Sequence, residues 1–225
     1  MDNRQCELEG VMAERQAMYR FLARAYRKEV DPELLREISQ LDFSTDTGVP
    51  EIDQGFQMLA HAVRQVNETT LTDWAADYAR TFLGAGPKQA GGAFPYESVY
   101  TSPRGLLMQE ARDQVVDLYR QEGVQRSADF HESEDHLALE LEFVAHLCEK
   151  TVRALEAQDE DALSRHLQSQ RVFLEQHLLA WVPRLCADVA HIATTEFYQA
   201  ISLITAGYLV IDRDMIDDLL LVPQA

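Results

Sequence analysis

The sequence is poor in cysteine. Its 225 residues include only three, Cys6, Cys148 and Cys186, which lie far apart and form no CxxC pair. An odd number at such spacing indicates neither a disulfide framework nor a zinc site. Cys148 and Cys186 fall within apolar helical patterns, and we predict that they are buried thiols of a reducing compartment.

Signals for export and membrane insertion are also missing. Residues 1–5 have neither the basic nor the apolar region of a signal peptide. The longest apolar run, at 201–211, is interrupted by Gly207 and is shorter than the ~20 residues that a membrane span needs. These absences lead us to expect a cytoplasmic protein.

Positive charge is scarce, because 20 Lys and Arg residues are outnumbered by 38 Asp and Glu residues, for a net charge of -18. Nucleic acid is therefore not an expected partner, since phosphates need a basic surface, and an anionic membrane surface is disfavoured too. A cationic partner is permitted, although solubility alone accounts for an acidic surface. Hydrophobic residues make up 46% of the chain, enough to form a core.

Motifs for catalysis, metals and nucleotides are absent as well. The chain has seven histidines but no HExxH, and a di-iron bundle would need two ExxH motifs where 188–191 supplies a single D-x-x-H. Ser98 lies outside any GxSxG, and the glycines of 84–95 form neither GxGxxG nor a P-loop. We therefore expect no metal site, no cofactor and no serine hydrolase.

Helical periodicity is what the sequence does have. Apolar residues recur at spacings of three and four, most clearly in 50–66 and 133–157. No alternating strand pattern with hairpin turns and no internal repeat is present. We predict an all-α fold, a single-domain globular bundle of about nine to eleven helices over 1–225. The loops at 84–95 and 124–132 are its natural seams.

Capping residues predict several helix ends. Ser133 is expected to cap the long helix that runs to about residue 157, and Ser102 to cap a helix that begins at the following proline. Pro183 is expected to end or kink its helix. Thr194 or Thr195 should cap the last core helix.

Aromatic residues gather around the glycine-rich segment 84–95. They are Tyr78, Phe82, Phe94, Tyr96 and Tyr100. Two interpretations stay open for them. They can pin a long loop to the bundle, or they can form an apolar groove with polar edges for an extended or helical peptide.

The polar candidates are Glu97 and the pair Asp135 and His136. Glu97 is suited to hold a guanidinium, because a carboxylate can accept two parallel N–H bonds. With Ser133 and Glu134, Asp135 can simply cap a helix, where the dipole favours acids. Capping does not explain His136, whose protonation the positive helix end would discourage. A histidine held neutral beside a carboxylate can accept a hydrogen bond from a ligand or donate one to it. Spacing alone leaves both interpretations open.

Several of these stretches resemble the TorD/DmsD/NarJ family, the redox enzyme maturation proteins, which are cytoplasmic chaperones specific for molybdoenzymes. The resemblance runs through most of the chain, and the stretches that carry it are 18–26 with 31–35, 78–84, 95–100 and 134–140. The family usually has proline directly before its Asp-His pair, where this chain has Glu134.

The resemblance implies an all-helical, non-catalytic chaperone. Such a protein binds the twin-arginine leader or the body of a molybdopterin-containing oxidoreductase, assists cofactor insertion and delays export until maturation. The motifs carry over to a leader-binding site formed by Tyr78, Phe82, Pro95, Tyr96, Ser98, Tyr100, Asp135 and His136. We add Glu97 on physical grounds, and expect Glu97 and Asp135 to hold the leader's arginines while aromatics take its apolar segment. The net charge of -18 favours encounter with a basic leader.

Two other functions stay open at this point. One is a nucleotide- or molybdenum-cofactor-binding protein that uses the same cleft, although no motif supports it. The other is a generic protein-interaction or oligomerisation module, and a homo-oligomer is compatible with a helical chain that has a long central loop. The sequence does not name the client enzyme.

Overall fold

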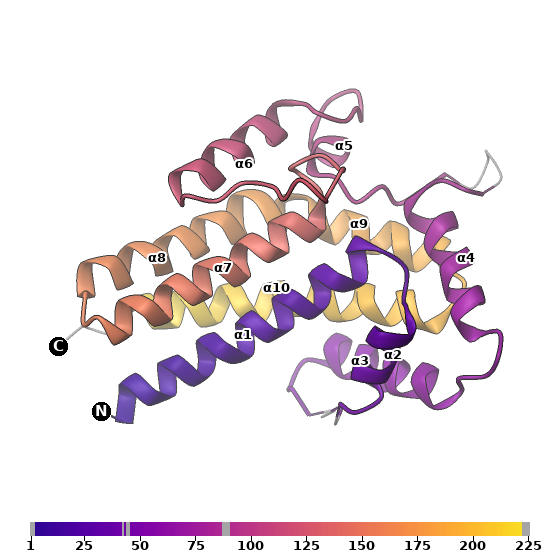
Figure 1. Cartoon of the computed structure of the whole chain (residues 1–225), viewed down its shortest axis with the longest axis horizontal. Helices are drawn as coiled ribbons and strands as arrows, with labels where there is room; N and C mark the ends of the chain where they lie inside the picture. Colours follow the sequence, from indigo (N-terminus) through magenta and orange to yellow (C-terminus); the bar gives the residue numbers. More distant parts are fainter. Residues whose placement is uncertain (1–2, 42, 44–45, 87–90, 222–225) are drawn as a thin grey trace. The chain divides into compact units, whose positions relative to one another are not determined.

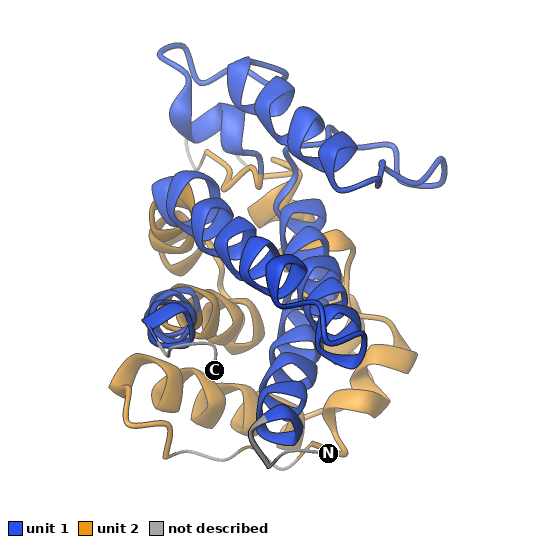
Figure 2. Ribbon diagram, turned by 90° about the vertical axis from the view of Figure 1, so that its left-hand side faces the viewer, with its two compact units in different colours: residues 1–24, 96–180, 209–225 blue, residues 25–95, 181–208 orange. Residues whose placement is uncertain are grey.

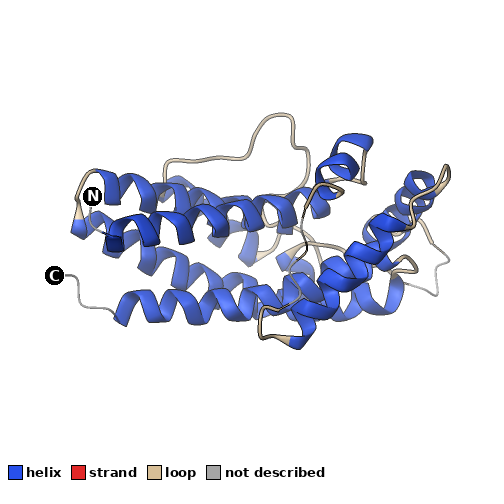
Figure 3. Ribbon diagram, turned by 90° about the horizontal axis from the view of Figure 1, so that it is seen from below, coloured by secondary structure: helices blue, strands red, loops and turns tan. Residues whose placement is uncertain are grey.

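The computed structural model describes residues 3–41, 43, 46–86 and 91–221. Within these ranges the chain forms helices and irregular segments and contains no β-strand (Figure 3). An isolated β-bridge is present. The predicted all-α class is therefore confirmed. Part of the loop expected between α4 and α5 lies outside the described residues.

The helices follow one another along the described chain in a single series (Figure 1). They are α1 (Asn3–Arg27), α2 (Pro32–Ile38), α3 (Pro50–Arg64), α4 (Thr70–Phe82), α5 (Glu97–Thr101), α6 (Glu110–Gln121), α7 (Leu137–Glu156), α8 (Glu160–Phe173), the π-helical segment η1 (Leu174–Leu178), α9 (Leu179–Ile192) and α10 (Glu196–Leu221). In the described ranges no helix combines the length and apolarity that crossing a membrane requires.

The chain divides into two compact units (Figure 2). Unit 1 comprises residues 1–24, 96–180 and 209–225, and unit 2 comprises residues 25–95 and 181–208. The break after Pro95 coincides with the end of the first predicted seam, whereas the second seam lies inside unit 1. That the chain behaves as one domain stays a prediction.

Unit 1 contains a charged cluster in its interior. The Arg15 side chain on α1 donates from Nε to Asp212 Oδ1 at 2.5 Å and from Nη2 to Oδ2 at 2.7 Å. Tyr19 also donates to Asp212, and Gln170 accepts from Arg15 while donating to Thr151 at 2.7 Å. Arg15 is 1% exposed and Asp212 is 0% exposed. Burial alone would lower the pKa of Arg15, but its bonds to Asp212 raise that pKa above the ordinary value.

In unit 2, α3 packs closely against α10 at two glycines, Gly55 on α3 and Gly207 on α10. A Cβ built on Gly55 would lie 2.6 Å from Ile204 Cγ1, and one built on Gly207 would lie 2.5 Å from Ile52 Cγ1. Any larger residue at either glycine would therefore force the two helices apart.

The buried thiols are confirmed. Cys148 and Cys186 are buried and Cys6 is exposed. Burial raises the pKa of Cys148 to about 11 and that of Cys186 to about 12. Both therefore remain protonated, unreactive thiols near neutral pH.

Two predicted helix starts are wrong. The long helix α7 begins at Leu137, and its N-cap is His136 rather than Ser133. Ser102 follows α5, and α6 begins only at Glu110, because Gly105 and Met108 have φ values of 60° and 56° that no α-helix contains.

Pro183 does not end its helix, which continues to Ile192. The turn before it is π-helical, with the Leu179 N–H bonded to the Leu174 carbonyl. A widened turn of this kind rearranges the backbone bonds beside a proline that cannot donate one.

Candidate functional site

Two segments of unit 1 that are far apart in sequence meet where α5 and α7 begin. Tyr96 and His136 form an isolated antiparallel bridge. The Glu97 N–H donates to the Asp135 carbonyl at 3.0 Å, and the Ser98 N–H donates to Asp135 Oδ2 at 2.9 Å. The Asp135 side chain thus caps the first turn of α5, a turn that otherwise lacks backbone acceptors. We call these five residues the α5–α7 junction.

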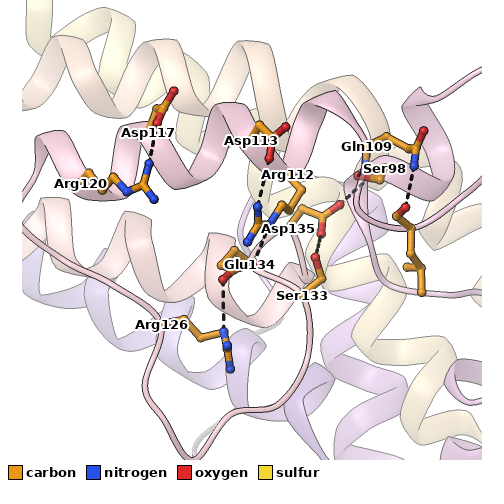
Figure 4. A network of polar contacts seen from close by, with 11 residues as sticks. Ser98, Gln109, Arg112, Asp113, Asp117, Arg120, Arg126, Ser133, Glu134 and Asp135 are labelled. Atoms are coloured by element: carbon orange, nitrogen blue, oxygen red, sulfur yellow. Dashed lines mark hydrogen bonds and ion pairs between the residues drawn. The ribbon is translucent and has the colours of Figure 1, made fainter.

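Side chains complete the hydrogen bonding of this junction (Figure 4). The Ser133 hydroxyl donates to Asp135 Oδ1, and Ser98 Oγ accepts from the Gln109 N–H at 3.0 Å. His136 Nδ1 accepts from the Ala138 N–H at 3.1 Å and therefore carries no proton on that nitrogen. The histidine caps α7 in the way that the aspartate caps α5.

Rings hold His136 in place. The Tyr96 ring lies edge-to-face with it at 5.0 Å, and the Phe130 ring does the same at 5.4 Å. The Tyr96 hydroxyl donates to Glu132 Oε2. His136 is therefore fixed by packing as well as by its bond to α7.

Glu97 is already engaged by a residue that the sequence analysis did not single out. His177 Nδ1 lies 3.0 and 3.2 Å from the two Glu97 carboxylate oxygens. The imidazole belongs to η1 and stacks on Phe173 at 4.9 Å. The only signal for His177 was its place as a lone histidine in an apolar helical pattern, because its partner lies 80 positions earlier in the chain.

The structure buries the residues that it brings together here. Relative exposure is 0% for Asp135 and Ser98, 3% for Glu97 and His136, and 9% for Tyr96. The side chains of Glu97, Asp135 and Tyr96 bond to His177, Ser133 and Glu132, which lie outside the set. As found in this structure, the junction is a closed structural contact between two helix starts rather than an open groove.

The remaining predicted site residues are not among these five. Pro95, which ends the first segment of unit 2, is buried, and Tyr100 on α5 is half-buried. Tyr78 and Phe82 belong to unit 2, with ring centroids 5.1 Å apart, and Phe82 packs edge-to-face on Tyr198 at 5.5 Å. They form part of that unit's aromatic core.

Within unit 2 the end of the glycine-rich loop is attached to α4. The Ala93 N–H donates to the Thr81 carbonyl at 2.7 Å. The Phe94 ring lies so close to Gly92 that a Cβ there would be 2.9 Å from the ring. These contacts agree with the interpretation that the aromatics pin the loop.

The described residues contain no group of three or more His, Cys, Asp or Glu side chains arranged to hold a metal ion. The junction itself offers carboxylates, a histidine and an aromatic ring, which are groups suited to hydrogen bonding and ion pairing.

A family model described as nitrate reductase delta subunit matches residues 49–187, more than half of the chain. The chain belongs to this family. The matched region contains both segments of the α5–α7 junction. The nitrate reductase delta subunit family is also consistent with the predicted resemblance to the TorD/DmsD/NarJ proteins, which is confirmed.

Relatives of this family member carry the name Chaperone protein TorD. The protein from Vibrio cholerae serotype O1 is 27% identical over 220 residues, which cover 95% of this chain and 97% of the relative. That from Vibrio atlanticus is 27% identical over 205 residues, covering 88% and 93%. That from Shewanella pealeana is 26% identical over 231 residues, covering 94% and 93%. The names confirm the expectation of a chaperone rather than an enzyme.

Proposed function

We propose that this chain is a chaperone for the maturation of a molybdopterin-containing oxidoreductase. It binds the apo catalytic subunit and its twin-arginine leader in the cytoplasm, assists insertion of the cofactor and delays export until the enzyme is complete. Two observations support this proposal. The model of the nitrate reductase delta subunit family matches a region that includes the junction, and a relative named Chaperone protein TorD aligns with 95% of the chain. Neither a nucleotide-binding protein nor a generic interaction module is favoured by these relatives.

The proposed leader site keeps the residues derived from the sequence, Tyr78, Phe82, Pro95, Tyr96, Glu97, Ser98, Tyr100, Asp135 and His136. Because Glu97 and Asp135 are buried and bonded, a leader arginine reaches them only if α5 leaves the start of α7. The arginine would then replace His177 at Glu97 and the Ser98 N–H at Asp135.

Two features support release of α5. The helix has only five residues, too few to be stable without its contacts. One of its attachments is the carboxylate of Asp135, which accepts from the Ser98 N–H at the start of α5 and also from the Ser133 hydroxyl. A guanidinium can satisfy such a carboxylate with two parallel bonds, which compensates for the loss of the cap.

The proposal is tested by calorimetric titration of the chain with twin-arginine leader peptides of the molybdoenzymes encoded in its own genome. We expect one leader to bind with micromolar affinity, and Asp135→Ala or Tyr96→Ala to weaken it about tenfold or more. Asp129→Ala, an exposed carboxylate in the loop before α7, is the matched control and should leave the affinity unchanged.

The dependence of leader affinity on salt concentration tests the electrostatic contribution to binding. Between about 50 and about 500 mM NaCl the affinity should fall, because surface charges are screened over shorter distances. A constant affinity would contradict the electrostatic contribution of the acidic surface to leader binding. Failure of every leader to bind would remove the leader site altogether.

A further inference from the structure

A cleft of 530 Å³ in unit 1 concentrates positive charge on an otherwise acidic protein. It lies between α6 and the segment that leads to α7, and three arginines line it, Arg112, Arg120 and Arg126. The volume is typical of sites for small molecules. Since the whole chain carries a net charge of -18, three arginines around one cleft stand against the general trend of its surface. We call it the arginine cleft.

Two of these guanidinium groups converge on Glu134 (Figure 4). Arg112 Nε donates to Glu134 Oε2 at 2.8 Å, and Arg126 Nε donates to Oε1 at 3.4 Å. Burial opposes the ionisation of Glu134, but the bonds from Arg112 and Arg126 lower its pKa below the ordinary value. Glu134 therefore carries a negative charge in the cleft.

The charges that line the cleft do not balance. Glu134 is the only carboxylate among the lining residues, so three guanidinium groups and one carboxylate leave two positive charges. Asp113 and Asp117 pair with Arg112 and Arg120 from outside, so the surplus belongs to the lining of the cleft and not to the whole cluster. These two carboxylates are 74% and 67% exposed, and solvent screens such surface pairs.

Donors remain available to a ligand. Arg112 uses Nε and Nη1, Arg126 uses Nε and Nη1, and Arg120 uses Nη1 alone. Across the part of the chain that the structure describes, the Nη2 group of each has no hydrogen-bond acceptor. A dianion with several oxygens would satisfy both the free donors and the surplus charge.

A smaller cavity adjoins the cleft. It has a volume of 170 Å³ and shares Tyr119, Val124, Gln125 and Arg126 with the cleft, while Leu139, Phe143, Glu142 and His146 complete its lining. The Tyr119 and Phe143 rings are 4.8 Å apart. A ligand whose anionic group lies among the arginines can place a small ring beside these aromatic side chains.

We propose that the arginine cleft binds a small phosphate monoester, with its dianion among the arginines and its organic group in the adjoining cavity. A single carboxylate would engage one guanidinium in two parallel bonds and leave the others unfilled, whereas a phosphate offers three oxygens and up to two charges. The proposal is independent of the leader site.

The test titrates the full chain with phenyl phosphate and methyl phosphate and follows binding by NMR. Phenyl phosphate should bind saturably and more tightly than methyl phosphate. Arg126→Gln should weaken it about tenfold, because one charge-assisted donor is lost. Glu134→Gln should strengthen it, because the repelling carboxylate is removed. Arg153→Gln, an exposed arginine of α7 that pairs with Glu149, is the control and should change nothing.

Circular dichroism of each variant shows whether it is folded. Arg126→Gln and Glu134→Gln both break the Arg126–Glu134 ion pair, yet they are expected to change the affinity in opposite directions. A loss of structure shared by both variants could not produce that result. Binding that does not saturate, or that is equally weakened by Arg153→Gln, would overturn the proposal. Equal affinities for the two esters would overturn the assignment of the adjoining cavity.

Discussion

Replacing Asp212 by alanine is expected to lower the free energy of unfolding of unit 1 by about 3–5 kcal/mol. Asp212 accepts from Arg15 through both carboxylate oxygens and from the Tyr19 hydroxyl, and it is fully buried. Its removal leaves the guanidinium of Arg15 in the interior without its counter-charge. Urea unfolding followed by circular dichroism measures the change.

Two further variants decide whether the uncompensated charge is the cause. Asp214→Ala removes a carboxylate of the same helix that is 63% exposed, and it should change stability by less than about 0.5 kcal/mol. The double variant Arg15→Met and Asp212→Leu should recover most of the loss, because buried ion pairs can be replaced by apolar residues at little cost. A double variant as unstable as Asp212→Ala would contradict this explanation.

Replacing Asp77 by alanine is expected to cost unit 2 about 2 kcal/mol. Asp77 on α4 is fully buried and accepts from the backbone N–H groups of Thr194 at 3.1 Å and Thr195 at 2.8 Å, as well as from both hydroxyls. These threonines precede α10, so the cap of the longest helix among the described residues comes from another helix.

Thermal unfolding measures this second loss. Asp73→Ala, one turn earlier on α4, removes an exposed carboxylate that accepts from the Thr69 hydroxyl at 2.9 Å, and should cost less than about 1 kcal/mol. Asp77→Asn should fall between the two, because its amide keeps one acceptor oxygen. If Asp77→Ala and Asp73→Ala were equally mild, the cap would not stabilise α10.

Local patterns predicted the helices well, because their apolar spacing is a property of neighbouring residues. The pattern of 133–157 corresponds to α7, and Thr195 does lie directly before α10. The errors arose where a distant segment decides the outcome. Ser133 fits a capping pattern, but its hydroxyl donates to Asp135, whose other carboxylate oxygen accepts from the Ser98 N–H at the start of α5.

The candidate site was predictable in its parts but not in its state. The motifs pointed to Tyr96–Ser98 and to Asp135 with His136, and the structure brings these together. Their burial was not predictable, because it depends on how α5 packs. The contact of Glu97 with His177 was equally hidden, since no local spacing connects residues 80 positions apart.

If this chain matures a molybdoenzyme, as we propose, the cofactor content of its client must depend on it. The oxidoreductase whose leader binds most tightly is produced in cells with and without the chain, and its molybdenum is measured per mole of purified enzyme. We predict that loading falls several-fold without the chain and is restored when the chain is supplied again. Equal molybdenum content and equal enzyme activity in both cells would contradict the proposed function.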